Sequence, residues 1–139
     1  MSPRVSTFIY SDDSVMEEMP IGQRLHVINP QQVLRPAFVP GMYSFSVSFG
    51  IIALDMAVEH NLRVAMTSPR NKQIMDSANM VVPTNTDFDL PPELQGFMMN
   101  MNVRNVVFEE EGLHQTSLWL DDVCLGDFPI YVKAARVSL

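Results

Sequence analysis

The segments FMMNMNV (residues 97–103), EEEG (109–112), HQTSLWL (114–120), DD (121–122) and FPIYV (128–132) follow one another in the last third of the chain. In the longer segments apolar residues alternate with polar ones, and Gly or Asp residues separate the segments. Such alternation with short polar turns is typical of an antiparallel β-meander. The last third therefore predicts an all-β fold.

The clearest strand lies earlier, at residues 43–51. A period of two argues against a helix, whose apolar stripe recurs every three to four residues. We expect the apolar set to face the core and the serines to form a small polar face on the other side. The apolar residues are Tyr43, Phe45, Val47, Phe49 and Ile51, and the serines between them are Ser44, Ser46 and Ser48.

Local signals extend this pattern along the chain. Leu62, Val64 and Met66 predict another strand, and SPRN (residues 68–71) has the composition of a type I turn. A change of parity after Val103 predicts a bulge near Arg104 and Asn105. Pro129 inside the last strand indicates an edge position.

The strand pattern predicts the fold class. We count about eight to nine strands and no helix, which favours a single-domain antiparallel β-sandwich, either immunoglobulin-like or a jelly roll. Residues 1–139 are expected to form this one domain. Residues 1–20 are a candidate peripheral arm, and SDDS (residues 11–14) is expected to end the first strand.

Composition limits the partners and the compartment. The 16 acidic and 9 basic side chains give a net charge of −7, which disfavours nucleic acid and anionic membranes as partners. The sequence has no internal disulfide framework, because Cys124 is the one cysteine. We see no signal-peptide segment and no apolar run of membrane-spanning length. A reducing cytoplasm is the expected location.

The pattern also resembles a group of known proteins. PGMYSFSV (residues 40–47), SPRN (68–71), LPP (90–92), GF (96–97), EGLH (111–114) and LWLDD (118–122) resemble small bacterial and phage-borne β-sandwich proteins of uncharacterised function. His114 and Asp122 depart from that pattern, which has Tyr and Gly at these places. The resemblance covers roughly residues 40–132 and implies a sandwich fold, but no activity and no site.

No catalytic or metal-binding arrangement stands out. The three histidines, His26, His60 and His114, lack the short spacing of metal ligands, and the acidic pairs lie on turns where solvated carboxylates are the ordinary interpretation. Cys124 lies between Val123 and Leu125, an apolar context that predicts a buried, unreactive thiol. We therefore expect no catalytic residue, no metal and no cofactor.

The candidate site is a surface patch on the late strands. If Phe97 and Leu118 face the core, their neighbours of opposite parity face outward. A Trp among amides on an open sheet can stack on a ligand or anchor a protein partner. Met side chains can also repack against several partners. The predicted patch consists of Met98, Asn100, Asn102, Gln115 and Trp119.

Three functional interpretations follow from this patch. The first is a non-catalytic intracellular interaction module that binds a protein partner or itself. The second is a sandwich that binds a carbohydrate or another small ligand through the same amide and Trp face. The third is a structural component of a phage or other assembly, which shares the chemistry of the first. Fold alone does not decide among them.

Overall fold

The computed structural model describes residues 2–135, which form ten β-strands and one short 3-10 turn. The all-β prediction is confirmed, and the strands number slightly more than expected. In chain order the elements are β1 (Arg4–Glu18), β2 (Gln23–Gln31), β3 (Val33–Leu34), β4 (Gly41–Ile52), β5 (His60–Thr67), β6 (Gln73–Asp76), β7 (Met80–Val82), the turn η1 (Pro92–Leu94), β8 (Gly96–Phe108), β9 (Gly112–Leu120) and β10 (Val123–Val132).

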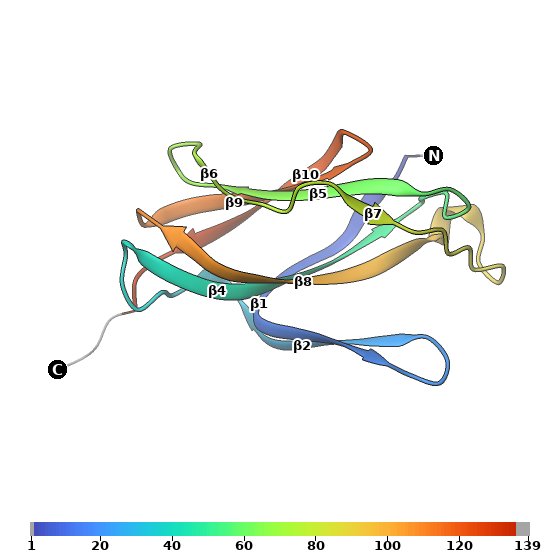
Figure 1. Ribbon diagram of the computed structural model, residues 1–139, viewed down its shortest axis with the longest axis horizontal. Coiled ribbons are helices and arrows are strands. Elements are labelled where there is room, and N and C mark those ends of the chain that lie inside the picture. Colours follow the sequence, from blue (N-terminus) through green and yellow to red (C-terminus); the bar gives the residue numbers. More distant parts are fainter. Residues whose placement is uncertain (1, 136–139) are drawn as a thin grey trace.

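The strands form two sheets that pack face to face (Figure 1). One sheet has the order β2-β1-β4-β8. The other has the order β3-β10-β9-β5-β6, and β7 also pairs with β5. The pairs are antiparallel except β3 with β10, which run parallel. The fold is thus a β-sandwich.

The last third of the chain is not one continuous meander. β9 and β10 form the expected hairpin, but β8 belongs to the facing sheet, where it pairs with β4. The acidic turn after β8 therefore crosses from one sheet to the other. Its carboxylates meet cations of the β5–β6 hairpin in the second sheet: Glu109 lies 2.9 Å from Lys72 Nζ, and Glu110 lies 3.0 Å from Arg70 Nε.

The core lies between the sheets and follows the predicted parities. Phe45, Val47 and Phe49 of β4 are at most 2% exposed, and the predicted apolar residues of β5 and β9 are also buried. The two sheets contact each other through aromatic rings, since Phe8 of β1 stacks on Phe128 of β10 with ring centroids 4.3 Å apart. Alternation in the sequence therefore assigns the buried face correctly in each of these strands.

Two local predictions are confirmed. The Ser68–Asn71 turn closes with a hydrogen bond of 2.8 Å from the Asn71 N–H to the Ser68 carbonyl. The bulge near Arg104 and Asn105 appears as a register shift between β4 and β8. Asn105 has a φ of 56°, and its N–H donates to Ser44 Oγ at 3.0 Å. The bulge restores the inward direction of Val106 and Phe108.

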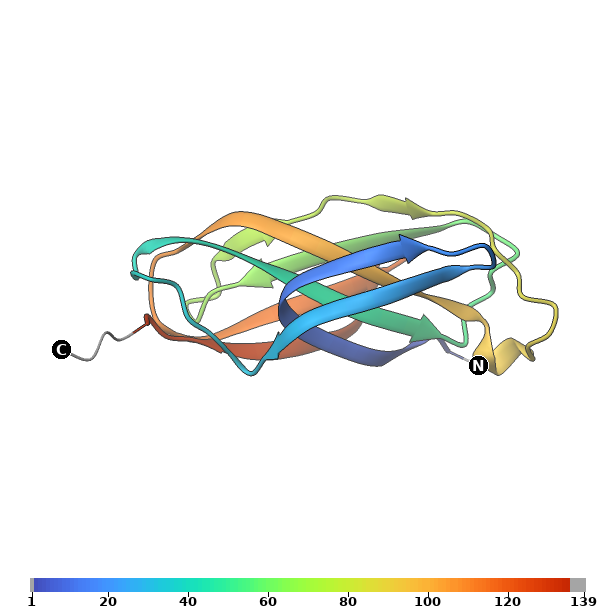
Figure 2. The same ribbon diagram turned by 90° about the horizontal axis from the view of Figure 1, so that it is seen from below.

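The first strand is longer than expected and does not end at SDDS. Its first half pairs with β4, and its second half pairs with β2 to form a hairpin. The strand continues through Asp12 because its neighbours pair with β2, and Asn29 and Gln31 of β2 donate to the Asp12 carboxylate at 2.6 and 3.1 Å. The hairpin crosses the outside of the β4–β8 sheet, as the view from below shows (Figure 2).

Candidate functional site

A buried layer of polar side chains joins the hairpin to the outside of the β4–β8 sheet. Ser14 of β1 contacts Ser46 of β4 through their hydroxyl groups, and the Asn100 amide donates to Ser14 Oγ at 2.9 Å. Ser46 Oγ donates to Asn102 Oδ1 at 3.0 Å. Ser14, Ser46 and Ser48 are at most 1% exposed. The serine face predicted from the sequence is therefore covered by the chain's own hairpin.

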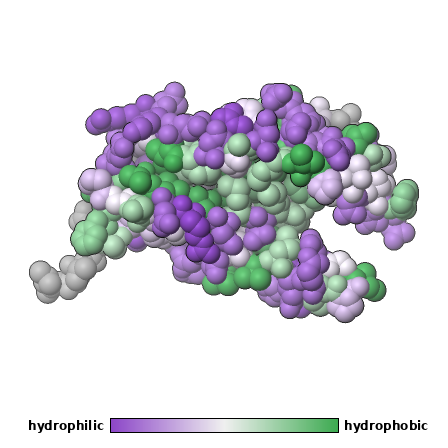
Figure 3. Space-filling view, in the orientation of Figure 1, coloured by the Kyte–Doolittle hydropathy of each residue, from purple (hydrophilic) through white to green (hydrophobic). Residues whose placement is uncertain are grey.

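Met98 lies beyond this layer, near the start of β8, and is 47% exposed. It borders an apolar hollow of about 280 Å³ on one long side of the sandwich, between β7 and β8. Hydrophobic side chains gather across the middle of this side, between more hydrophilic rims (Figure 3). The hollow is lined by Met56, Val81, Val82, Pro83, Asn85, Phe97, Met98 and Met99.

The free edge of β8 runs along the same side. Within residues 2–135, β8 pairs with β4 alone, so the backbone groups on its other edge have no partner strand. The regular part of this edge, residues 96–103, contains neither a charged residue nor a proline. The bulge at Asn105 ends it on one side, and the loop that precedes Gly96 ends it on the other.

The other sheet edges carry features that discourage pairing with another chain. β2 contains Arg24 and Pro30, and Asn29 interrupts it with a φ of 55°. β6, β7 and β3 are four, three and two residues long. Among the edge strands β2, β3, β6, β7 and β8, β8 is thus the long one without such protection.

Gln115 and Trp119 lie on the opposite side of the molecule. Both belong to β9 in the second sheet, where they face away from the core, while Leu118 and Leu120 face into it. The structure therefore brings Met98, Asn100 and Asn102 together on one sheet and places Gln115 and Trp119 on the other. Alternation predicted the correct parity for each strand, but not the sheet to which each strand belongs.

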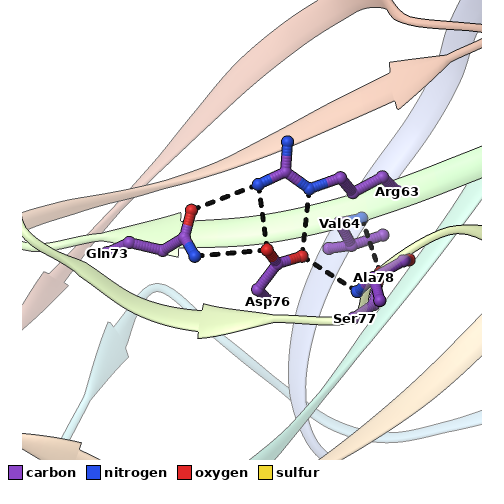
Figure 4. Close-up of polar contacts among 6 residues, drawn as sticks. All are labelled: Arg63, Val64, Gln73, Asp76, Ser77 and Ala78. Atoms are coloured by element: carbon purple, nitrogen blue, oxygen red, sulfur yellow. Dashed lines mark hydrogen bonds and ion pairs between the residues drawn. The ribbon is translucent and has the colours of Figure 1, made fainter.

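Trp119 is covered in part by a cation. The guanidinium carbon of Arg63 lies 4.9 Å from the centroid of the indole ring. Arg63 donates to both carboxylate oxygens of Asp76, at 3.0 and 2.9 Å, and to Gln73 at 3.2 Å (Figure 4). The hydrogen bonds from Arg63 lower the pKa of Asp76. This group covers part of Trp119 and joins β6 to β5.

Cys124 is exposed, so the prediction of a buried thiol is wrong. Cys124 pairs directly with Trp119, so its side chain lies on the same outward face of the sheet. Its nearest polar contacts are the Gly126 carbonyl at 3.8 Å and an Asp127 oxygen at 4.0 Å. No group of three or more metal-ligating side chains occurs among the residues that the structure describes.

Two histidines occupy opposite electrostatic environments. His60 has acceptors on both ring nitrogens: Nδ1 lies 2.6 Å from Asp121 Oδ2, and Nε2 lies 2.6 Å from the Asp55 carbonyl. Burial acts to lower the pKa of His60, but these hydrogen bonds and the Asp121 charge outweigh it, so the pKa is raised. Burial lowers the pKa of His114, which packs edge-on against Phe108.

These shifts predict a maximum of stability near pH 6.5, the ordinary pKa of histidine. The His60 contribution is complete below that pH and is lost as the pH rises through its raised pKa. The His114 contribution is complete above it and is lost as the pH falls towards its lowered pKa. Urea midpoints between about pH 5 and pH 8.5 measure both limbs.

His60→Gln should reduce only the loss of stability above pH 6.5. His114→Gln should reduce only the loss of stability below pH 6.5. The lowered pKa of Asp121, caused first by its hydrogen bond to His60, acts only near and below the ordinary carboxyl range and does not interfere. A wild-type stability that changes in the same direction across the whole interval, and keeps doing so in both variants, would contradict this assignment.

The family comparison covers most of the chain. Residues 13–133 match the model described as "Family of unknown function (DUF6941)". The chain belongs to this family. Among curated proteins, none matches the DUF6941 sequence. No relative therefore defines a function for this chain.

Two solved structures resemble the DUF6941 fold. One is the Pseudomonas fluorescens alkylpurine DNA glycosylase AlkC bound to DNA that contains an abasic site analogue, with a TM-score of 0.50, 8% identity and 95% of this chain covered. The DUF6941 chain spans 30% of that protein's length, and the likeness extends to the fold alone. The other is an immunoglobulin-like protein from Pseudomonas aeruginosa, with a TM-score of 0.37, 13% identity, and 96% of this chain and 98% of that chain covered.

Within residues 2–135, no helix has the length and apolar character needed to cross a membrane.

Proposed function

We propose that this protein is a non-catalytic interaction module of the cytoplasm and that β8 is its binding edge. The observation that carries the proposal is the unpaired, uncharged edge of residues 96–103 beside an apolar hollow. An exposed strand edge binds another strand through main-chain hydrogen bonds, and neighbouring apolar side chains add affinity. Such binding requires no catalytic group.

The partner that this edge fits best is a second copy of the chain. A net charge of −7 opposes contact between two copies over most of the surface. The β8 edge avoids this repulsion, because no charged residue lies between Glu93 and Arg104. An antiparallel pairing centred on Asn100 would place Met98 opposite Asn102 of the second copy. It would also place Met99 opposite Met101, so that each cross-strand pair is neutral.

This pairing also obeys the symmetry of most protein dimers. The same strand meets itself about a two-fold axis, and the contact closes with two copies instead of continuing as a fibre. It would extend each four-stranded sheet into the sheet of the other copy and bury the apolar side chains around Met98. The acidic charge and this neutral edge support a protein partner and not a nucleic acid.

The proposal predicts that a single charge on the edge disrupts the dimer. Met98→Lys places a cation within the apolar contact, opposite Asn102 of the second copy, and should weaken the dimer roughly tenfold or more. Val107→Lys is the matched control, because Val107 lies on the same strand beyond the bulge and is also 47% exposed. Sedimentation velocity over a dilution series measures the dissociation constant of each protein.

The expected result is a concentration-dependent dimer for the wild type and for Val107→Lys, and a monomer for Met98→Lys. Thermal unfolding shows whether the introduced lysine leaves the fold intact, so that a misfolded variant is not counted as a monomer. A wild type that stays monomeric throughout the series would overturn self-association. If the two substitutions weaken the dimer equally, the interface does not lie at residues 96–103 of β8.

A further inference from the structure

A second hollow lies under the long loop that follows β7, at the end of the sandwich where the β4–β5 turn is found. It has a volume of about 580 Å³, within the range of ligand pockets. Leu54 and Met56, each 2% exposed, form an apolar floor. Phe88 stands at the rim with 94% of its surface exposed.

The walls of this hollow are held in place by hydrogen bonds. The buried Gln95 side chain accepts from the Asp87 N–H at 3.0 Å and donates to the carbonyls of Asp87 and Leu90. The Asn85 N–H donates to the Met56 carbonyl at 2.9 Å, which fastens the loop to the β4–β5 turn. The hollow is therefore a formed site and not a gap beneath an unanchored loop.

The charges of the lining have one sign. Within the described part of the chain, Asp55 and Asp87 carry the only ionisable side chains that line the hollow, and no Lys, Arg or His does so. One oxygen of Asp55 accepts a hydrogen bond from the Ala57 N–H, and one oxygen of Asp87 accepts a hydrogen bond from the Asp89 N–H, each at 3.0 Å. The second oxygen of each has no hydrogen-bond partner among the described residues. An apolar floor below two carboxylates suits a cation on an aliphatic stem and disfavours an anion.

We infer that this hollow binds the Lys or Arg side chain of a protein partner. The aliphatic stem would lie over Leu54 and Met56, and the cationic end would reach Asp55 and Asp87. Phe88 supplies an exposed ring for the partner's flanking surface and for cation–π contact. The interaction role proposed above is needed only to identify the ligand as a protein side chain. Binding of a cation to the hollow does not depend on β8 pairing.

The test uses blocked single amino acids and the full chain. N-acetyl-lysine N-methylamide and its arginine counterpart are titrated into ¹⁵N-labelled protein, and backbone amide shifts give the site and the affinity. The norleucine analogue keeps the aliphatic stem without the charge, and the glutamate analogue reverses the charge. We expect saturable shifts at residues 53–57 and 86–95 with lysine or arginine, and at least about fivefold weaker binding with norleucine.

Substitutions separate the two carboxylates from general acidity. Asp55→Asn with Asp87→Asn should weaken lysine binding about tenfold. Glu109→Gln with Glu110→Gln removes the same number of charges at the turn after β8 and should change binding less than about twofold. Equal affinity for lysine and norleucine, equal effects of the two double variants, or no saturable shift in the loop would each overturn the inference. A monomeric protein that binds lysine here would contradict only the β8 dimer.

Discussion

Replacing Gly96 with Ala is expected to lower the free energy of unfolding by about 3 kcal/mol, the upper part of the usual range for overpacking. An alanine Cβ at this position would lie 1.8 Å from the Ile51 carbonyl oxygen and 2.8 Å from the Ile51 carbonyl carbon. Both are backbone atoms of the paired strand, so no side-chain rotation can relieve the clash. The end of the β4–β8 pair must open instead.

Gly126→Ala provides the control for this substitution. Its added Cβ would meet the Phe128 ring at 3.0 Å, and a side chain can move where a strand backbone cannot. Differential scanning calorimetry should show a midpoint lower by roughly 10 °C for Gly96→Ala and a clearly smaller change for Gly126→Ala. Equal changes in the two variants would mean that β4 and β8 do not pair in the register that places Gly96 opposite Ile52.

Local features of this fold could be predicted from the sequence because they depend on neighbouring residues. The alternation of Phe45, Val47 and Phe49 fixes which face of β4 is buried, whatever strand lies beside it. The change of parity after Val103 requires an extra residue before Val106, and the structure places that bulge at Asn105. Neither inference needs knowledge of a distant contact.

Long-range pairing could not be predicted in the same way. β8 follows β4 by more than forty residues and still lies beside it, while the sequence suggested β9 as its neighbour. Trp119 has the parity of an exposed residue, but Arg63 from another strand covers part of it. Alternation therefore assigned the faces of the predicted patch strand by strand, and the division of these residues between two sheets depends on contacts that alternation does not encode.

The serine face of β4 is a second case in which alternation predicts the face of a residue but not its distant contacts. Alternation assigned Ser46 and its neighbours to the polar side, which is correct, but it could not show that a hairpin would cover them. Ser46→Leu places a branched apolar side chain in a layer where Ser46 is fully buried against Ser14 and Asn102. We expect a loss of about 3 kcal/mol, from overpacking and from polar groups left without partners.

The loss should be concentrated in the hairpin, since Ser14 lies in its first strand and the core between the sheets is unchanged. Arg24 of β2 then becomes a sensitive trypsin site, because cleavage needs the paired strands to separate. Ser46→Ala is the control: it removes the hydroxyl without adding volume and should accelerate cleavage at Arg24 much less. If Ser46→Leu left both the unfolding midpoint and the cleavage rate at the wild-type values, the hairpin could not be packed on this face.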